Sequence, residues 1–292
     1  MEDAGRTRCD PRGMSPDGIG SEHARQVGRL FDALSATYDA VGVDFFGPIA
    51  EGLLAALPPT PGEHWLDIGV GRGAVLLPAA EVIGHDGRAV GTDISAGMLE
   101  VCRDVAEARG LPFVELVQDD AQSPAVPGLF DTVSSSLVLF FLTDPQAALR
   151  AWLGLLRPGG RLGVTTFGAN DPRWDAVDDV FTPYLPPDLR DARTSGAAGP
   201  FGSDAGMEAL VAAAGFTAVR TVTGAVPVRF ADADQWHAFT WSVGQRRMWM
   251  GVPEGERAAV RAEAYARLAT YADADGSVTF VQGVRHTLAL RP

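Results

Sequence analysis

The sequence predicts a doubly wound α/β fold, in which a mainly parallel sheet is covered by helices on both faces. Short apolar runs of strand length alternate with helical patterns between residues 61 and 167, and this alternation is typical of parallel sheets. A loop with three glycines follows the first run, and acidic residues stand at the ends of the first three runs. Ligands of such sheets bind at the carboxyl ends of the strands, so these residues mark an expected ligand site.

Two segments precede the first expected strand. Residues 1–20 are rich in Gly, Pro, Asp and Arg without periodicity, and we expect them to form a disordered tail. In residues 21–60 apolar side chains recur at helical spacing, which predicts an N-terminal helical cap. The breaker run Pro59 to Gly62 separates this cap from the main domain, residues 61–292.

The first strand is expected at His64 to Ile68, and a loop with Gly69, Gly71 and Gly73 follows it in the stretch WLDIGVGRG. Glycine is needed where the backbone turns sharply or where a ligand approaches the main chain too closely for a Cβ. Asp67 brings a charge to this loop. The spacing DxGxGxG differs from the GxGxxG that binds dinucleotide pyrophosphates, so a different cofactor is indicated.

Four further strands are expected. Arg88 to Ile94 ends in Asp93, about twenty residues after the loop, where doubly wound folds place a ribose-binding acid. Val114 to Val117 runs into QDDAQ, which contains Asp119 and Asp120. The fourth strand lies in LFDTVSSSLVLFFLTDP, and the fifth follows the turn in RPGGRLGVTTF. Helices are expected between them at Ala74 to Ile83, Ala96 to Arg109 and Pro145 to Leu156.

These five segments resemble, in order and spacing, the motifs of class I S-adenosylmethionine (SAM) methyltransferases of the small-molecule, natural-product type. WLDIGVGRG resembles motif I, QDDAQ the GDA segment, and the fourth-strand segment the pattern FDxVxSxxxLxxLxDP. The resemblance covers roughly Pro61 to Phe167 plus a C-terminal hairpin. It implies a seven-stranded, mostly parallel, Rossmann-like sheet whose antiparallel last strand is inserted between the fifth and sixth. It also implies SAM as cofactor, S-adenosylhomocysteine as product, and no metal.

The resemblance assigns cofactor contacts to the strand ends and to one N-terminal segment. Asp93 would bind the ribose hydroxyls and Asp120 the adenine amino group. Tyr38, in the segment FDALSATYD, would lie near the SAM carboxylate or pack in the core. Arg72 would pair with that carboxylate or point outward. The expected cofactor-binding residues are Tyr38, Asp67, Gly69, Gly71, Arg72, Gly73, Asp93, Ile94, Met98, Asp119, Asp120, Ala121, Ser135, Ser136 and Leu137.

Two stretches without counterpart in the strand and helix alternation, residues 168–202 and 232–275, are expected to be insertions that cap the site. The second contains His237 next to Trp236, and His237 is the candidate general base, with core packing as its alternative. Arg246 and Arg247 would receive an acidic substrate group or form a solvated face. The expected substrate contacts are Phe140, Phe141, Trp236 and Trp241, and each of them has packing as its alternative.

Composition limits the partners and the compartment. The chain has 37 acidic and 24 basic residues and a net charge of −13, which disfavours nucleic acid and anionic membranes because both need a basic surface. Its two cysteines, Cys9 and Cys102, predict no disulfide framework. No apolar run approaches the roughly twenty residues that span a bilayer. We therefore expect a cytoplasmic protein, a monomer or a homodimer.

The expected function is methyl transfer from SAM to an O, N, C or carboxylate nucleophile. The acceptor would be a small or medium-sized, partly apolar metabolite or modified peptide of secondary metabolism, and usage rich in Ala, Gly and Arg suggests a bacterial gene. Two alternatives remain open: a SAM-binding cyclase or regulator that does not methylate, and a nicotinamide-dependent oxidoreductase. The glycine spacing and the Asp120-Ala121 segment argue against the oxidoreductase.

Overall fold

The computed structural model describes residues 20–185 and 199–292. The expected N-terminal tail, apart from Gly20, lies outside the described residues, and so does part of the expected insertion at 168–202. The structure therefore tests the sheet, the helices around it and the second insertion.

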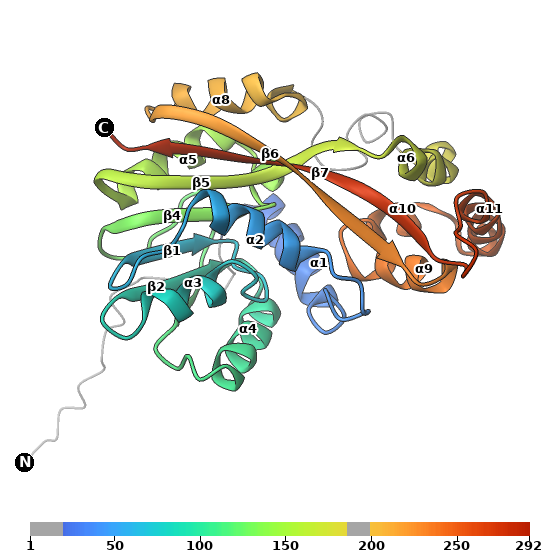
Figure 1. Ribbon diagram of the computed structural model, residues 1–292, viewed down its shortest axis with the longest axis horizontal. Helices are drawn as coiled ribbons and strands as arrows, with labels where there is room; N and C mark the ends of the chain where they lie inside the picture. Colours follow the sequence, from blue (N-terminus) through green and yellow to red (C-terminus); the bar gives the residue numbers. More distant parts are fainter. Residues whose placement is uncertain (1–19, 186–198) are drawn as a thin grey trace, which may run out of the picture.

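A seven-stranded sheet in the order β3-β2-β1-β4-β5-β7-β6 forms the centre of the molecule (Figure 1). β7 is antiparallel to both of its neighbours, and the other pairs are parallel. This confirms the predicted fold class, including the insertion of the last strand between the fifth and the sixth. The strands are β1 His64–Ile68, β2 Arg88–Asp93, β3 Glu115–Gln118, β4 Phe130–Ser136, β5 Leu156–Asn170, β6 Thr217–Phe230 and β7 Val278–Leu290.

Helices cover both faces of the sheet and create two separate cores. In β1, Trp65 belongs to the core under one set of helices and Leu66 to the core on the other face, as expected for a strand that is buried on both sides. The first set is α2 Phe46–Ala56, α3 Leu76–Ile83 and α4 Ala96–Ala108, and the second is α5 Pro145–Leu155 and α8 Asp204–Ala213. α1, Glu22–Leu34, packs beside α4 (Figure 1).

The helix starts follow their sequence signals. The side chains of Ser95, Asp144 and Ser203 each accept a hydrogen bond from a backbone N–H in the first turn of α4, α5 and α8, which satisfies a donor that has no partner within the helix. Pro145 then occupies the first turn of α5, where its missing N–H costs nothing. α4 and α5 begin at the predicted residues Ala96 and Pro145, and α3 begins at Leu76, two residues after the predicted Ala74.

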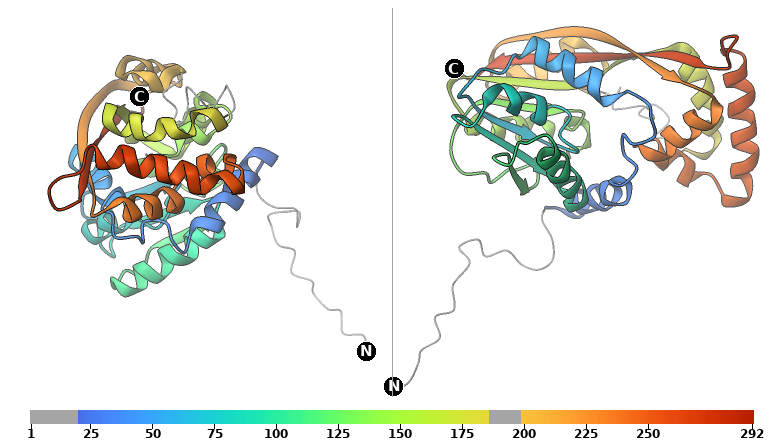
Figure 2. Two further views of the ribbon diagram at one scale, coloured as in Figure 1. Left: turned by 90° about the vertical axis from the view of Figure 1, so that its right-hand side faces the viewer. Right: turned by 60° about the horizontal axis from the view of Figure 1, so that its bottom comes forward.

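A third core lies at the far end of the long strands β5, β6 and β7 (Figures 1 and 2). Its helices are α6 Pro172–Asp178, α9 Ala233–Ser242, α10 Arg246–Gly251 and α11 Arg257–Ala269, with the 3-10 turns η2 Asp179–Tyr184 and η4 Glu254–Glu256. Trp236 and Trp249 are at most 1% exposed within it. The large apolar side chains of the second insertion are therefore buried mainly against one another and the strand ends.

Two findings concern membranes and metals. No helix within residues 20–185 and 199–292 is long and apolar enough to cross a bilayer. The same residues contain no group of three or more His, Cys, Asp or Glu side chains placed to hold a metal ion.

His286 occupies the middle of β7, where Thr165 and Val222 are its neighbours on the flanking strands. Its Nδ1 lies 2.9 Å from Thr165 Oγ1, and only 3% of the residue is exposed. Gly52 of α2 approaches the ring so closely that a Cβ there would lie 2.6 Å from Nε2. Burial lowers the pKa of His286 from 6.5 to about 4, so the folded protein holds it neutral.

We expect His286 to make the fold sensitive to acid. Between pH 6.5 and about 4 the unfolded chain binds a proton that folded His286 does not, so the free energy of unfolding falls as the pH falls through this window. Urea unfolding across the window should show a steeper loss for the wild type than for His286→Gln, which keeps a polar partner for Thr165 but does not titrate. His85→Gln, at an exposed turn, is the control; equal slopes for wild type and His286→Gln would contradict the prediction.

Candidate active site

The carboxylate of Asp93, at the end of β2, holds two loops in place. Its Oδ2 accepts from the backbone N–H of Gly71 at 2.8 Å, and its Oδ1 accepts from the backbone N–H of Ser95 at 2.9 Å. The glycine loop after β1 and the start of α4 are therefore tied to one side chain. Burial raises the pKa of Asp93 to about 6, opposed by these backbone hydrogen bonds.

Asp67, at the end of β1, is oriented by a chain of two hydrogen bonds. The indole N–H of Trp65 donates to Ser134 Oγ at 2.7 Å, and Ser134 Oγ donates to Asp67 Oδ1 at 2.7 Å. Only 2% of Asp67 is exposed, and burial raises its pKa to about 7. Two carboxylates with weakened acidity thus stand side by side at the strand ends, where a bound cation would favour their ionised form.

The three loop glycines have different roles. A Cβ on Gly69 would lie 2.2 Å from Val138 Cγ2, so the segment after β4 can approach only a glycine here. Gly71 has φ +52 and nothing within 4 Å of its Cβ position, and it lines a cavity where a ligand can reach the main chain. Gly73 does not line this cavity; a Cβ there would meet Leu77 and Cys102. Gly73 therefore serves helix packing.

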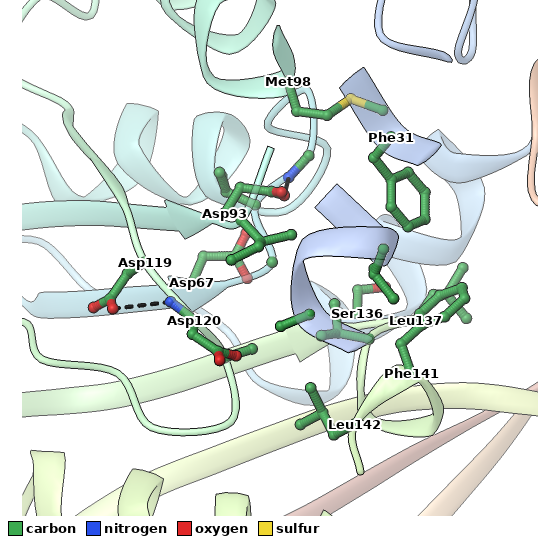
Figure 3. Close-up of a pocket in the computed structure, with 18 of the residues that line it drawn as sticks. Phe31, Asp67, Asp93, Met98, Asp119, Asp120, Ser136, Leu137, Phe141 and Leu142 are labelled. Atoms are coloured by element: carbon green, nitrogen blue, oxygen red, sulfur yellow. Dashed lines mark hydrogen bonds between the residues drawn. The ribbon is translucent and has the colours of Figure 1, made fainter. Parts of the chain in front are cut away.

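The third and fourth strands complete one wall of the cavity. Asp119 accepts from the backbone N–H groups of Asp120 and Ala125 at 2.9 and 2.7 Å, so its carboxylate is turned into the loop after β3 (Figure 3). Both acids are lining residues of the cavity. Ser136 lines the cavity, whereas Ser135 is fully buried and donates to the carbonyl oxygen of Ile68. Ser135 thus binds β4 to β1 and does not line the cavity.

Leu137, the first residue after β4, has a backbone conformation that non-glycine residues rarely adopt. Its φ is +61, in the left-handed region, and its N–H donates to the carbonyl oxygen of Thr165 at 2.9 Å. Such strain persists only where the surroundings impose it, and it concentrates at functional sites. Leu137 lines this cavity and also a second one.

Helix α1 covers the first cavity from the other side, opposite the acids (Figure 3). His23 Nε2 donates to the carbonyl oxygen of Phe141 at 2.8 Å. Asp32 accepts from Ser95 Oγ at 2.6 Å and from the backbone N–H of Gly97 at 3.0 Å. α1 is thereby fixed to the exits of β4 and β2. Predicted residues that line this cavity are Tyr38, Asp67, Gly69, Gly71, Arg72, Asp93, Ile94, Met98, Asp119, Asp120, Ala121, Ser136 and Leu137.

Tyr38 and Arg72 meet at the edge of this cavity. A guanidinium nitrogen of Arg72 donates to the backbone carbonyl of Tyr38, so Arg72 joins the glycine loop to the N-terminal segment. The ring of Tyr38 stacks on Phe46, with centroids 4.6 Å apart, and meets the edge of Phe31 at 5.9 Å. Tyr38 is a lining residue of this cavity and of a second one.

A second, larger cavity adjoins the first. Its volume is about 310 Å³, against about 140 Å³ for the first. Its wall is mainly apolar and rich in aromatic rings, with the polar residues Asn170, Asp175, Asp178, Gln245, Arg247 and Gln282 at intervals. The two cavities share five residues, Phe31, Tyr38, Phe46, Leu137 and Phe141. We call these five the junction.

Phe140 and Phe141 line the second cavity, where substrate contacts were expected. The structure places the other three candidates differently: His237, Trp236 and Trp241 line neither cavity. Trp241 Nε1 donates to His237 Nε2 at 3.0 Å, and Trp236 is fully buried. These side chains contact one another and Trp249, because an aromatic helix that closes a small core must turn its rings inward. We do not carry them into the proposed site.

Several lining residues escaped the sequence analysis. Phe31 and Phe46 lie on α1 and α2, Phe167 near the end of β5, and Trp174, Phe239 and Gln282 on three further elements. Their spacing carries no signal, since helix and strand positions of this kind usually pack in a core. Of the two arginines expected to receive an acidic substrate group or form a solvated face, Arg247 lines the second cavity and is exposed, whereas Arg246 stacks over Trp241 and donates to the carbonyl oxygen of Ala33.

Comparisons with known proteins identify the family. A family model described as a methyltransferase domain matches residues 66–164. Nocamycin O-methyltransferase of Saccharothrix syringae is 38% identical over 276 residues, which cover 90% of this chain and 98% of the relative. The chain belongs to the SAM-dependent methyltransferases. Aklanonic acid methyltransferase of Streptomyces sp. strain C5 is 40% identical over 167 residues, 57% of this methyltransferase and 76% of the relative.

One solved structure illustrates that a shared fold does not establish a shared reaction. The [4+2]-cyclase SpnF matches with a TM-score of 0.56 over 94% of this chain and 99% of its own, at 20% identity. That likeness shows the fold and not the reaction. Family membership, which rests on the sequence relatives, decides for methyl transfer over the nicotinamide-dependent alternative.

The residues of the first cavity fit SAM. Acids at the ends of β2 and β3 can accept hydrogen bonds from ribose hydroxyls and an adenine amino group. The open side of Gly71 admits a ligand against the main chain. The carboxylates of Asp67 and Asp93 can balance the positive charge of a sulfonium group.

The methyltransferase with Asp93→Ala should bind S-adenosylhomocysteine about ten- to a hundredfold more weakly. This loss is expected because a charged hydrogen bond is removed and the glycine loop is no longer held in place. Calorimetry would measure this, with Asp104→Ala on the exposed face of α4 as control. An unchanged affinity would show that Asp93 does not contact the cofactor.

Cofactor binding by this methyltransferase should depend on pH, and more for SAM than for its product. Asp67 and Asp93, with pKa values raised to about 7 and about 6, must lose protons to oppose the sulfonium cation. The Kd of SAM should therefore rise as the pH falls below about 7. The Kd of S-adenosylhomocysteine should rise less, because its sulfur carries no charge. Calorimetry in buffers of different ionisation enthalpy would show proton release on SAM binding, and Asp67→Asn should reduce it. Equal pH dependence for both ligands would contradict this assignment.

Proposed function

We propose that this methyltransferase transfers the methyl group to an oxygen that is already an anion at neutral pH, on a partly apolar natural product held in the second cavity. Carboxylates and acidic enols or phenols are such oxygens. We further propose that α1 and the helices of the third core act as a cap over the two cavities. The observation that carries the proposal is the chemical character of the junction.

Four of the five junction residues are apolar, and only Tyr38 is titratable. Burial, followed by the nearby charges of Asp39 and Asp93, raises the pKa of Tyr38 far above its usual value. Its phenol therefore keeps its proton at neutral pH and can donate a hydrogen bond but cannot accept a proton from a substrate. Among the described residues, each other titratable side chain of the two cavities lines only one of them.

A junction of this kind suits an acceptor that needs no deprotonation. When bound, SAM supplies an electrophilic methyl group, and an oxygen anion can attack it without a general base. The protein then contributes position and exclusion of water. Phe140 packs against Phe141 and Phe167, with centroids 4.9 and 5.7 Å apart, and these rings form an apolar surface for the substrate beside the junction.

The names of two relatives agree with this proposal. One is an O-methyltransferase and the other acts on a compound named as an acid. The cyclase or regulator alternative has only the fold likeness in its favour, which does not distinguish reactions.

Methylation should therefore require an acidic oxygen. Incubation with SAM and matched pairs of aromatic acids and alcohols should yield S-adenosylhomocysteine with the acids alone. The kcat/KM should stay flat between about pH 7.5 and 9, since no enzymic base titrates there, and Tyr38→Phe should keep kcat within about tenfold of wild type. Turnover of the alcohols, or a loss of more than about a hundredfold in Tyr38→Phe, would show that the enzyme uses a base.

A further inference from the structure

Three polar side chains from separate elements form a chain of hydrogen bonds in the wall of the second cavity. Gln282 of β7 donates through Nε2 to Asn170 Oδ1 at 3.0 Å, and Asn170, the last residue of β5, donates through Nδ2 to Asp175 Oδ1 of α6 at 3.1 Å. All three line the cavity. The chain joins two strand regions and a helix across a wall that is otherwise mainly apolar.

The direction of this chain is fixed by its last member. An ionised carboxylate can only accept hydrogen bonds, so Asp175 requires the amide nitrogen of Asn170 to face it. The side-chain oxygen of Asn170 then faces Gln282, so Gln282 must donate through its side-chain nitrogen. The second N–H of Gln282 donates to the carbonyl oxygen of Gly283 at 2.9 Å, so both amide protons of Gln282 are used.

What remains for a ligand is a pair of acceptors. Gln282 is only 7% exposed, and within residues 20–185 and 199–292 neither its Oε1 nor Asp175 Oδ2 has a hydrogen-bond partner. The amide nitrogens of Gln282 and Asn170 already donate hydrogen bonds within the wall. Neither of the two acceptor oxygens is a fully buried atom, so each is accessible, and a ligand that brings a donor gains a hydrogen bond there.

We propose that this wall is a subsite for a hydrogen-bond donor of the substrate, a hydroxyl or N–H group whose proton is accepted by Gln282 Oε1 or Asp175 Oδ2. The inference rests on the proposed function in one respect, namely that the second cavity takes the substrate. The donor is a different group from the methyl acceptor: an oxygen anion has no proton to give, and the carboxylate of Asp175 repels it. The subsite therefore orients the substrate with its donor at this wall and its anion toward the junction.

The test compares ligands that differ only in the donor. Biphenyl carboxylate, its para-hydroxyl derivative and its para-methoxy derivative are titrated into the full-length protein saturated with S-adenosylhomocysteine. For the wild type we expect the hydroxylated acid to bind about tenfold more tightly than the parent acid, on the scale of one hydrogen bond to a charged or buried group. The methoxy derivative, which has the oxygen but no proton, should show no such advantage.

Two variants locate the effect. In Gln282→Met the advantage of the hydroxyl should fall below about twofold, while the affinity for the parent acid stays within about twofold of wild type. Asp175→Asn should also reduce the advantage, and it serves where Gln282→Met fails to fold. Gln146→Met, on α5 and outside both cavities, is the matched control and should keep it. Melting temperature and S-adenosylhomocysteine affinity verify the fold of each variant.

Equal binding of the hydroxylated and parent acids to the wild type would overturn the subsite, and so would an advantage that survives in both variants. Methyl transfer is scored separately, as S-adenosylhomocysteine formed from SAM. A hydroxyl advantage that disappears in the variants, together with no turnover of any acid, would support the subsite and count against the proposed methyl acceptor.

Discussion

The wall of the first cavity in this methyltransferase depends on the carboxylate of Asp93. Through Gly71 and Ser95 it bonds the loop after β1 and the start of α4 at once, and Ser95 in turn bonds Asp32 of the covering helix. A buried acid stays charged only where such donors compensate its desolvation. The same side chain thus fixes the glycine loop and is available to a ligand. A substitution of Asp93 would therefore change both the conformation of the loop and the binding of a ligand.

Most of the fold could be predicted because its determinants are local. β1 has the bounds that its sequence predicts, and α4 and α5 begin at the predicted residues Ala96 and Pro145. The strand order required the family resemblance, since nothing in the residues of β7 alone says that it enters between β5 and β6. The ends of long strands were less predictable: β5 continues to Asn170, past the motif that marks it.

The two cavities of the site also differ in how well the sequence predicts them. The first cavity is built partly from strand ends that follow one another in sequence, so most of the predicted cofactor-binding residues line it, whereas its lining from α1 was not predicted. Exceptions such as Gly73 and Ser135 differ by one residue from true lining positions, a distinction set by side-chain direction. The second cavity draws Phe31, Trp174, Phe239 and Gln282 from four elements far apart in the chain. Only the tertiary fold brings these residues together. The hydrogen bond between Trp241 and His237 likewise depends on the tertiary fold and could not be predicted from sequence.

The existence of separate cores has a consequence for how such enzymes diversify. The residues that bury the helices at the far end of β5, β6 and β7 form one cluster, while α3, α4, α5 and α8 are buried in two others on either side of the sheet. A substitution that reshapes the second cavity therefore alters the packing of the third core and leaves the other two cores intact. Substitutions in the second cavity can thus change which substrate fits while the packing on the two faces of the central sheet is preserved, because separate clusters of buried residues stabilise these parts.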